Sequence, residues 1–169
     1  MSGRPGMLAP MGDSGAQGTL TVEEAVAIAQ EAHANQLDKA AAPYIDHPLR
    51  VMERFHDELH QIVAVLHDVV EDAGTLGYDL EYLRQRGAPR DVIEAIDALS
   101  HRPDEPDEKY WARVAANSVA QAVKLADIAD NSNPERLARL APDERERLTA
   151  KYARARAALR APASEAAEA

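Results

Sequence analysis

Apolar side chains recur every three to four residues along most of the chain between Thr21 and Ala158. This spacing is typical of amphipathic α-helices with one face buried. No stretch shows the strict alternation of a half-buried β-strand. The pattern therefore predicts an all-α fold, a compact bundle of several helices.

Capping and turn residues divide this pattern into separate helices. Thr21 and Glu24 form a capping box for a first helix through about residue 34. Pro48 fits the first turn of a short second helix, with Asp46 or His47 as its cap. Glycine and proline residues mark later breaks. The expected helices are 21–34, 48–55, one starting near residue 57, 80–86, 90–99, 109–116, one capped by residue 117 or 118, and 142–159; residues 72–77 are expected to form a loop.

Length and composition indicate one globular domain. The chain has 169 residues, enough to bury a hydrophobic core. Hydrophobic residues make up 46% of the chain and aromatic residues only 4%, which predicts an aliphatic core between closely packed helices. Residues 1–19 are rich in Gly, Ser and Pro, and we expect them and residues 161–169 to be disordered tails around a domain of residues 20–160.

The net charge of −10 argues against nucleic acid as a partner, because binding to a phosphate backbone needs a concentrated basic surface. No apolar run reaches transmembrane length, and residues 1–18 lack the basic and apolar segments of a signal peptide. We therefore expect neither membrane insertion nor secretion. The pattern leaves the oligomeric state open.

The most informative local feature is His67-Asp68, which lies inside an apolar run predicted to be a buried helix. A buried imidazole or carboxylate costs several kcal/mol unless it is paired or binds a metal. Neighbouring residues are about 100° apart around a helix, so both side chains can reach one ion. Glu71 and Asp72 follow one turn later on the same edge. Such an acidic stripe is either a solvated helix face or a cation site.

Two other segments offer further ligands. Asp127 follows an apolar stretch and lies one turn from both Lys124 and Asn131. His47 precedes Pro48, where a histidine can also serve as a cap or a packing residue. Taken together, His47, His67, Asp68 and Asp127 predict one metal site. Two imidazole nitrogens and two carboxylates suit Mn²⁺, Fe²⁺ or Zn²⁺.

A divalent ion at such a site lowers the pKa of water and neutralises charge on phosphoryl oxygens, which is the chemistry of phosphate ester hydrolysis. Glu71 is the candidate general base, with Asp72 as its partner. Lys39, Arg50 and Lys124 are candidates for contact with phosphate, although each can also be an ordinary surface cation. The sequence therefore predicts a metal-dependent phosphohydrolase.

The order of these candidate ligands resembles that of a known family. The order His47, His67-Asp68 and Asp127 resembles the H…HD…D signature of the HD-domain metal-dependent phosphohydrolases. Residues 32–131 resemble more narrowly the hydrolase domain of RelA/SpoT proteins and the small alarmone hydrolases. The segments that carry this resemblance are PYIDHP (43–48), LHDVVED (66–72) and VKLAD (123–127).

The resemblance implies an HD-domain fold with His47, His67, Asp68 and Asp127 as ligands, usually of manganese. It further implies that Glu71 and Asp72 orient or deprotonate the attacking water. Asn131 matches a residue that contacts the ribose or phosphate of the substrate, and Lys39 matches a basic residue at the mouth of the pocket. The implied reaction removes the 3′-pyrophosphate from guanosine tetra- or pentaphosphate, and the implied location is the cytoplasm.

The chain departs from the family pattern around the nucleotide base. Asp38 occupies the place of an arginine that packs against the base, Ile128 follows the KLAD segment in place of arginine, and Pro134 replaces a threonine that faces the substrate. We therefore expect hydrolysis of a small phosphorylated nucleotide, first of all guanosine-3′,5′-bis(diphosphate) (ppGpp). The alternatives are another HD nucleotidase or phosphodiesterase with a different base preference, and a noncatalytic module that senses nucleotides.

Overall fold

The computed structural model describes residues 19–38 and 41–160. Within these residues the structure is helical apart from loops and one isolated bridge between Leu37 and Pro43. The prediction of an all-α fold is therefore confirmed. The predicted tails, except Thr19, and the predicted site residue Lys39 lie outside the described residues.

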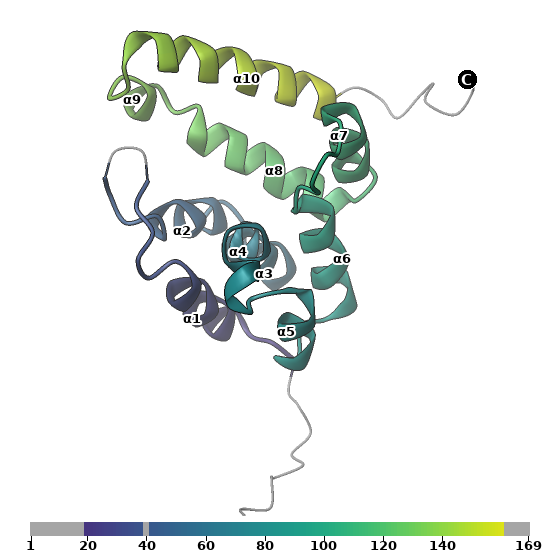
Figure 1. The fold of residues 1–169 in the computed structure, drawn as a ribbon. Helices are drawn as coiled ribbons and strands as arrows, with labels where there is room; N and C mark the ends of the chain where they lie inside the picture. Colours follow the sequence, from purple (N-terminus) through teal and green to yellow (C-terminus); the bar gives the residue numbers. More distant parts are fainter. Residues whose placement is uncertain (1–18, 39–40, 161–169) are drawn as a thin grey trace, which may run out of the picture.

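The helices follow one another through the described part of the chain in the order shown in Figure 1. They are α1 (Val22–Ala32), α2 (Asp46–Met52), α3 (Glu58–Leu66), α4 (Val69–Ala73), the short 3-10 helix η1 (Gly74–Leu76), α5 (Leu80–Gln85), α6 (Arg90–Leu99), α7 (Asp107–Ala115), α8 (Ser118–Asn131), α9 (Pro134–Leu137) and α10 (Pro142–Arg160). None of these helices combines the length and the apolarity needed to cross a membrane.

Local capping explains where several helices begin. The capping box of Thr21 and Glu24 is present at the start of α1. The Asn117 side chain accepts a hydrogen bond from the Ala120 amide at 3.0 Å and starts α8. Asp57 and Asp79 cap α3 and α5 in the same way. These caps satisfy amide groups that have no partner within the helix, so the predicted starts of α1 and α8 are confirmed.

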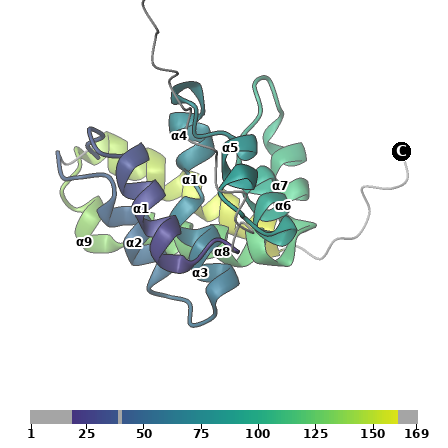
Figure 2. The same ribbon diagram turned by 90° about the horizontal axis from the view of Figure 1, so that it is seen from below.

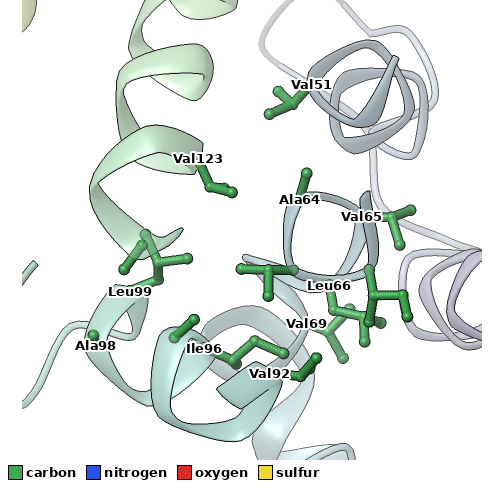
Figure 3. Close-up of a cluster of buried hydrophobic side chains, with 14 of the residues drawn as sticks. Val51, Ala64, Val65, Leu66, Val69, Val92, Ile96, Ala98, Leu99 and Val123 are labelled. Carbon is green, nitrogen blue, oxygen red and sulfur yellow. The ribbon is translucent and has the colours of Figure 1, made fainter. Parts of the chain in front are cut away.

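Helix α3 lies at the centre of the bundle and packs against α1, α2, α6 and α8. Its residues 62–66 are all buried, and Figure 3 shows Leu66, Val69, Val92 and Ile96 converging between the helices. As expected, the core is mainly aliphatic. Figure 2 shows α1, α2 and α9 on one side of the molecule and α5, α6 and α7 on the other. Helix α3 therefore contacts helices from both sides of the molecule.

One prediction about this helix is wrong. His67 and Asp68 do not lie within a continuous helix but form the turn between α3 and α4. The His67 ring explains this break, because its Nδ1 atom lies 2.7 Å from the carbonyl oxygen of Ala64 and takes the place of a main-chain donor. The turn still brings the His67 ring to 3.9 Å from Asp127 on α8, with Asp68 next to that ring.

Two further boundary predictions are corrected. Neither Asp46 nor His47 caps α2: Ile45 occupies the cap position without a side-chain hydrogen bond, and the His47 ring is engaged elsewhere. The segment 72–77 is not a simple loop, since α4 continues to Ala73 and η1 follows. The reversal at Gly77 has φ of 99°, a conformation that glycine adopts without strain. The sequence pattern also missed the short helix α9.

Arg113 on α7 ties the end of α6 to the following segment. Its guanidinium donates to the carbonyl oxygens of Asp97, Ala98 and Ser100 at 2.6, 2.9 and 3.2 Å and also pairs with Glu105. The last carbonyls of a helix have no partner within the helix. Arg113 therefore fixes the position of α7 relative to α6.

We predict that Arg113→Met lowers the free energy of unfolding by about 1 to 3 kcal/mol, because main-chain carbonyls lose their donor. Chemical denaturation measures this change. The matched control is Arg90→Met, which removes an exposed arginine from an ion pair with Glu94 on α6 and should leave the denaturation midpoint unchanged. Equal midpoints for the two variants would contradict the role assigned to Arg113.

Candidate metal centre and its two cavities

Three of the four predicted ligands lie together and are buried. His47 comes from α2, His67 from the turn after α3, and Asp127 from α8, and their potential ligand atoms all lie within 4.8 Å of one another. The fourth, Asp68, brings its Oδ2 atom to 3.0 Å from Nε2 of His67. Three separate segments thus supply a single cluster of donor atoms.

The His67 ring has a defined orientation. Its Nδ1 atom faces the carbonyl oxygen of Ala64, which can only accept, so Nδ1 carries the proton. Its Nε2 atom is buried and has no hydrogen-bond partner in the described structure. This atom lies 3.0 Å from Oδ2 of Asp68 and 3.9 Å from Oδ1 of Asp127. A lone pair that faces two carboxylates requires a positive charge between them, from either a proton or a cation.

His47 is held from both sides. Its Nε2 atom lies 3.1 Å from Oδ1 of Asp127, and its Nδ1 atom lies 2.8 Å from Oδ2 of Asp130. Arg50 and Arg136 in turn donate to Asp130 at 2.6 to 3.1 Å. A carboxylate behind a histidine commonly fixes the orientation of a metal-binding imidazole. Our sequence analysis missed Asp130, although its position one turn after Asp127 was a usable signal.

The electrostatics of the cluster favour a cation. Burial alone would lower the pKa of each histidine, but the nearby carboxylates outweigh it: Asp68 and Asp127 raise the pKa of His67 to about 9, and Asp127 and Asp130 raise that of His47. Burial conversely raises the pKa of Asp68 and Asp127, yet the neighbouring cationic groups hold both well below their usual range. The donor set of nitrogen and oxygen atoms fits a divalent metal ion.

Tyr44 adds a contact to Asp68 that the sequence did not predict. Its hydroxyl donates to Oδ2 of Asp68. The ring centroids of Tyr44 and His33 are 5.0 Å apart, and Nδ1 of His33 lies 2.6 Å from the Gln36 side chain. Tyr44 therefore links Asp68 to the His33 ring at the end of α1.

A small cavity of about 260 Å³ opens beside the cluster. Asp68, Asp127, Glu71, Lys124 and Asn131 all line it. Nζ of Lys124 lies 2.9 Å from one oxygen of Asp127, and the Asn131 amide donates to the other at 2.5 Å. Although burial lowers the pKa of Lys124, Asp127 outweighs this effect and raises it, so Lys124 is a cation at neutral pH. The structure thus brings these predicted residues together.

The two carboxylates of the predicted acidic pair, Glu71 and Asp72, have different surroundings. Glu71 lines the small cavity and accepts a hydrogen bond from the His101 amide at 3.0 Å. Asp72 does not line this cavity and instead accepts from the Gln36 side chain at 2.8 Å. The two carboxylates therefore do not face the same space.

A larger cavity of about 550 Å³ lies on the other side of Asn131 and Tyr152, which line both cavities. Its wall includes Asp38, Tyr44 and Arg50. Arg50, a candidate for contact with phosphate, lines this cavity and also donates to Asp130 at 3.0 and 3.1 Å. Arg50 therefore holds the carboxylate behind His47, and its role toward phosphate stays a prediction.

The positions that depart from the family pattern have structural roles of their own. Asp38 accepts a hydrogen bond from the Ala42 amide at 3.0 Å and lies 3.6 Å from the guanidinium of Arg136. Pro134 occupies the first turn of α9, and Ile128 is buried. The larger cavity therefore presents a carboxylate paired with an arginine where the family pattern has an arginine.

Comparisons with known proteins show sequence relatives but no family match. No protein family model matches the chain. The bifunctional (p)ppGpp synthase/hydrolase SpoT of Escherichia coli K12 is 29% identical over 136 residues, 75% of this chain and 19% of the relative. A probable GTP pyrophosphokinase of Mycobacterium leprae is 30% identical over 134 residues, 74% of this chain and 17% of the relative. The chain thus spans about a fifth of the length of these relatives.

A solved structure has a similar fold. It belongs to a metazoan ortholog of SpoT described as hydrolysing ppGpp, and it superposes with a TM-score of 0.67 at 23% identity, covering 82% of this chain and 85% of that one. The similarity in fold and in sequence, together with the buried cluster of histidine and aspartate, supports an HD-type hydrolase domain.

Proposed function

We propose that this protein is a metal-dependent phosphohydrolase of a small phosphorylated nucleotide, and that its substrate is ppGpp, from which it removes the 3′-pyrophosphate. The buried Nε2 atom of His67, which faces Asp68 and Asp127 with no hydrogen-bond partner, is the observation that carries the proposal. This arrangement suits a divalent cation. The names of the relatives, one of them a guanosine-3′,5′-bis(diphosphate) 3′-pyrophosphohydrolase of E. coli O157:H7, support the choice of substrate.

His47, His67, Asp68 and Asp127 would hold the ion, and we propose Mn²⁺, with Fe²⁺ and Zn²⁺ also compatible with these donors. When bound, such an ion supplies Lewis acidity that favours attack by water and offsets charge on phosphoryl oxygens. The sequence contains no cysteine, so the site has no thiolate ligand that would favour a softer metal ion.

The remaining residues of the small cavity have complementary roles. Glu71 reaches the cavity with a carboxylate that can accept a proton from the attacking water. Lys124 keeps its positive charge beside Asp127 and can contact a phosphoryl oxygen. Asn131 lines both cavities and can contact the ribose or the adjoining phosphate. Asp72 acts indirectly, by holding Gln36 in the wall of the larger cavity.

The larger cavity has the volume expected of a small-molecule site, about 300 to 1,000 Å³. We propose that it takes the nucleoside, while the phosphates lie toward the metal. The carboxylate of Asp38 in its wall favours a second candidate, an HD nucleotidase with another base preference. A noncatalytic nucleotide sensor is the third possibility, and turnover distinguishes it from both enzymes.

We predict that the protein with Mn²⁺ releases pyrophosphate from guanosine 3′-pyrophosphates and that EDTA or Asp68→Ala reduces this to background. Phosphate and pyrophosphate release from a panel of guanosine and adenosine nucleotides measures it. Pyrophosphate release from adenine substrates alone would support the second candidate. Binding of the nucleotides without any turnover would contradict an enzymatic function.

Glu71 and Asp72 should differ sharply in their effect on turnover. We predict that Glu71→Gln lowers kcat by about 10² to 10⁴, the usual contribution of a general base. Asp72→Asn, the matched control one residue away, should act mainly on KM through Gln36. Steady-state kinetics in saturating Mn²⁺ compares them. Retained kcat in Glu71→Gln would remove its assigned role.

Asp130 should control metal affinity without itself binding the ion. We predict that Asp130→Ala weakens Mn²⁺ binding by about 10- to 100-fold, because the His47 ring loses the carboxylate that orients it. Asp130→Asn keeps a hydrogen-bond acceptor and should weaken binding less. Calorimetric titration with Mn²⁺ gives the affinities, and circular dichroism checks the fold. Wild-type affinity in the alanine variant would contradict this role.

A further inference from the structure

Helix α10 contributes a cationic face to the small cavity. Lys151, Tyr152, Arg154 and Ala155 all line it, a spacing that places them on one face of the helix. Neither Lys151 nor Arg154 has a carboxylate partner among the residues that the structure describes. By contrast, Arg147 on the same helix is paired with Glu144.

The charge of this cavity depends on the metal. Its wall carries the carboxylates of Asp68, Glu71, Asp107 and Asp127 and the cations of Lys124, Lys151 and Arg154. Without an ion the carboxylates outnumber the cations. With a divalent cation held by Asp68 and Asp127 the positive charges exceed the negative ones, so the cavity attracts anions only after the metal has bound.

The size and the position of the small cavity indicate which class of anion it can bind. The cavity, at about 260 Å³, is less than half the volume of its neighbour and lies below the usual range for a nucleoside-sized ligand. It shares Asn131 and Tyr152 with the wall of the larger cavity. A nucleotide in the larger cavity would therefore extend its phosphates past these two residues toward α10.

We propose that the small cavity is a pyrophosphate subsite in which Lys151 and Arg154 contact the terminal phosphate. This inference rests on the proposed function and adds the residues that distinguish a pyrophosphate from a single phosphate. Lys124 lies on α8, 2.9 Å from Asp127, whereas Lys151 and Arg154 line the cavity from a different helix, α10. An anion with two phosphate groups can use the cations of both helices, one group for each.

The test uses inorganic pyrophosphate and orthophosphate as probes with the Mn²⁺-loaded full chain. Isothermal titration calorimetry compares wild type, the double variant Lys151→Gln with Arg154→Gln, and a matched control, Arg145→Gln with Arg160→Gln. The control removes two exposed cations of the same helix that line neither cavity. Mn²⁺ affinity is measured for each variant.

We expect wild type to bind pyrophosphate more tightly than orthophosphate, and only with metal. The cavity variant should lose about tenfold or more in pyrophosphate affinity, because two charge-assisted contacts are removed, while its affinities for orthophosphate and Mn²⁺ stay within about twofold. The control should match wild type. Pyrophosphate affinity that is unchanged in the cavity variant, or no pyrophosphate binding in wild type, would overturn the subsite.

A nucleotide assay separates this inference from the function on which it rests. With 3′-pyrophosphate substrates, the cavity variant should show a KM raised about tenfold and a metal dependence like that of wild type. If wild type binds pyrophosphate through Lys151 and Arg154 but hydrolyses no nucleotide, the proposed function fails and the subsite stands. If wild type is active and the variant has an unchanged KM and pyrophosphate affinity, the subsite alone fails.

Discussion

The Nε2 atom of His67 is buried against the carboxylates of Asp68 and Asp127 with no donor between them. The other ring nitrogen, Nδ1, is hydrogen-bonded to the Ala64 carbonyl oxygen. Rotation of the ring would relieve the repulsion between the Nε2 lone pair and the carboxylates but would break this hydrogen bond. Added positive charge, from a proton or a cation, removes this repulsion, and a divalent ion would do so for His47 as well. The geometry of the cluster therefore suits a cation, and the small cavity opens beside it.

Contacts around the cluster hold its side chains in position. The turn between α3 and α4 brings His67 and Asp68 to α8, and Asp130 on α8 holds the other histidine from behind. Arg50 and Arg136 neutralise Asp130, so the supporting carboxylate does not add uncompensated charge to the interior. The cations near the centre therefore fall into two groups. Arg50 and Arg136 pair with Asp130 behind His47, whereas Lys124 on α8 and Lys151 and Arg154 on α10 line the small cavity.

The sequence predicted the parts of this arrangement that depend on local pattern. Helical periodicity and the caps at Thr21 and Asn117 located most helices. The apolar surroundings of the four candidate ligands predicted that they meet, namely His47, His67, Asp68 and Asp127. The sequence could not predict the break at His67, because no glycine or proline marks it and the cause is a hydrogen bond from the ring itself. It missed Asp130 although the spacing from Asp127 was available, and it missed the separation of Glu71 from Asp72 because that depends on how distant helices pack.

The most direct test of the account is a titration of metal-free protein with Mn²⁺, in which electron paramagnetic resonance reports the free ion. The account predicts one tightly bound ion per chain, loss of that binding in His67→Ala, and wild-type binding in His60→Ala, whose ring lies by Asp57 at the start of α3. Absence of tight binding in wild type, or equal binding in the two histidine variants, would contradict the central claim that the buried cluster is a metal site.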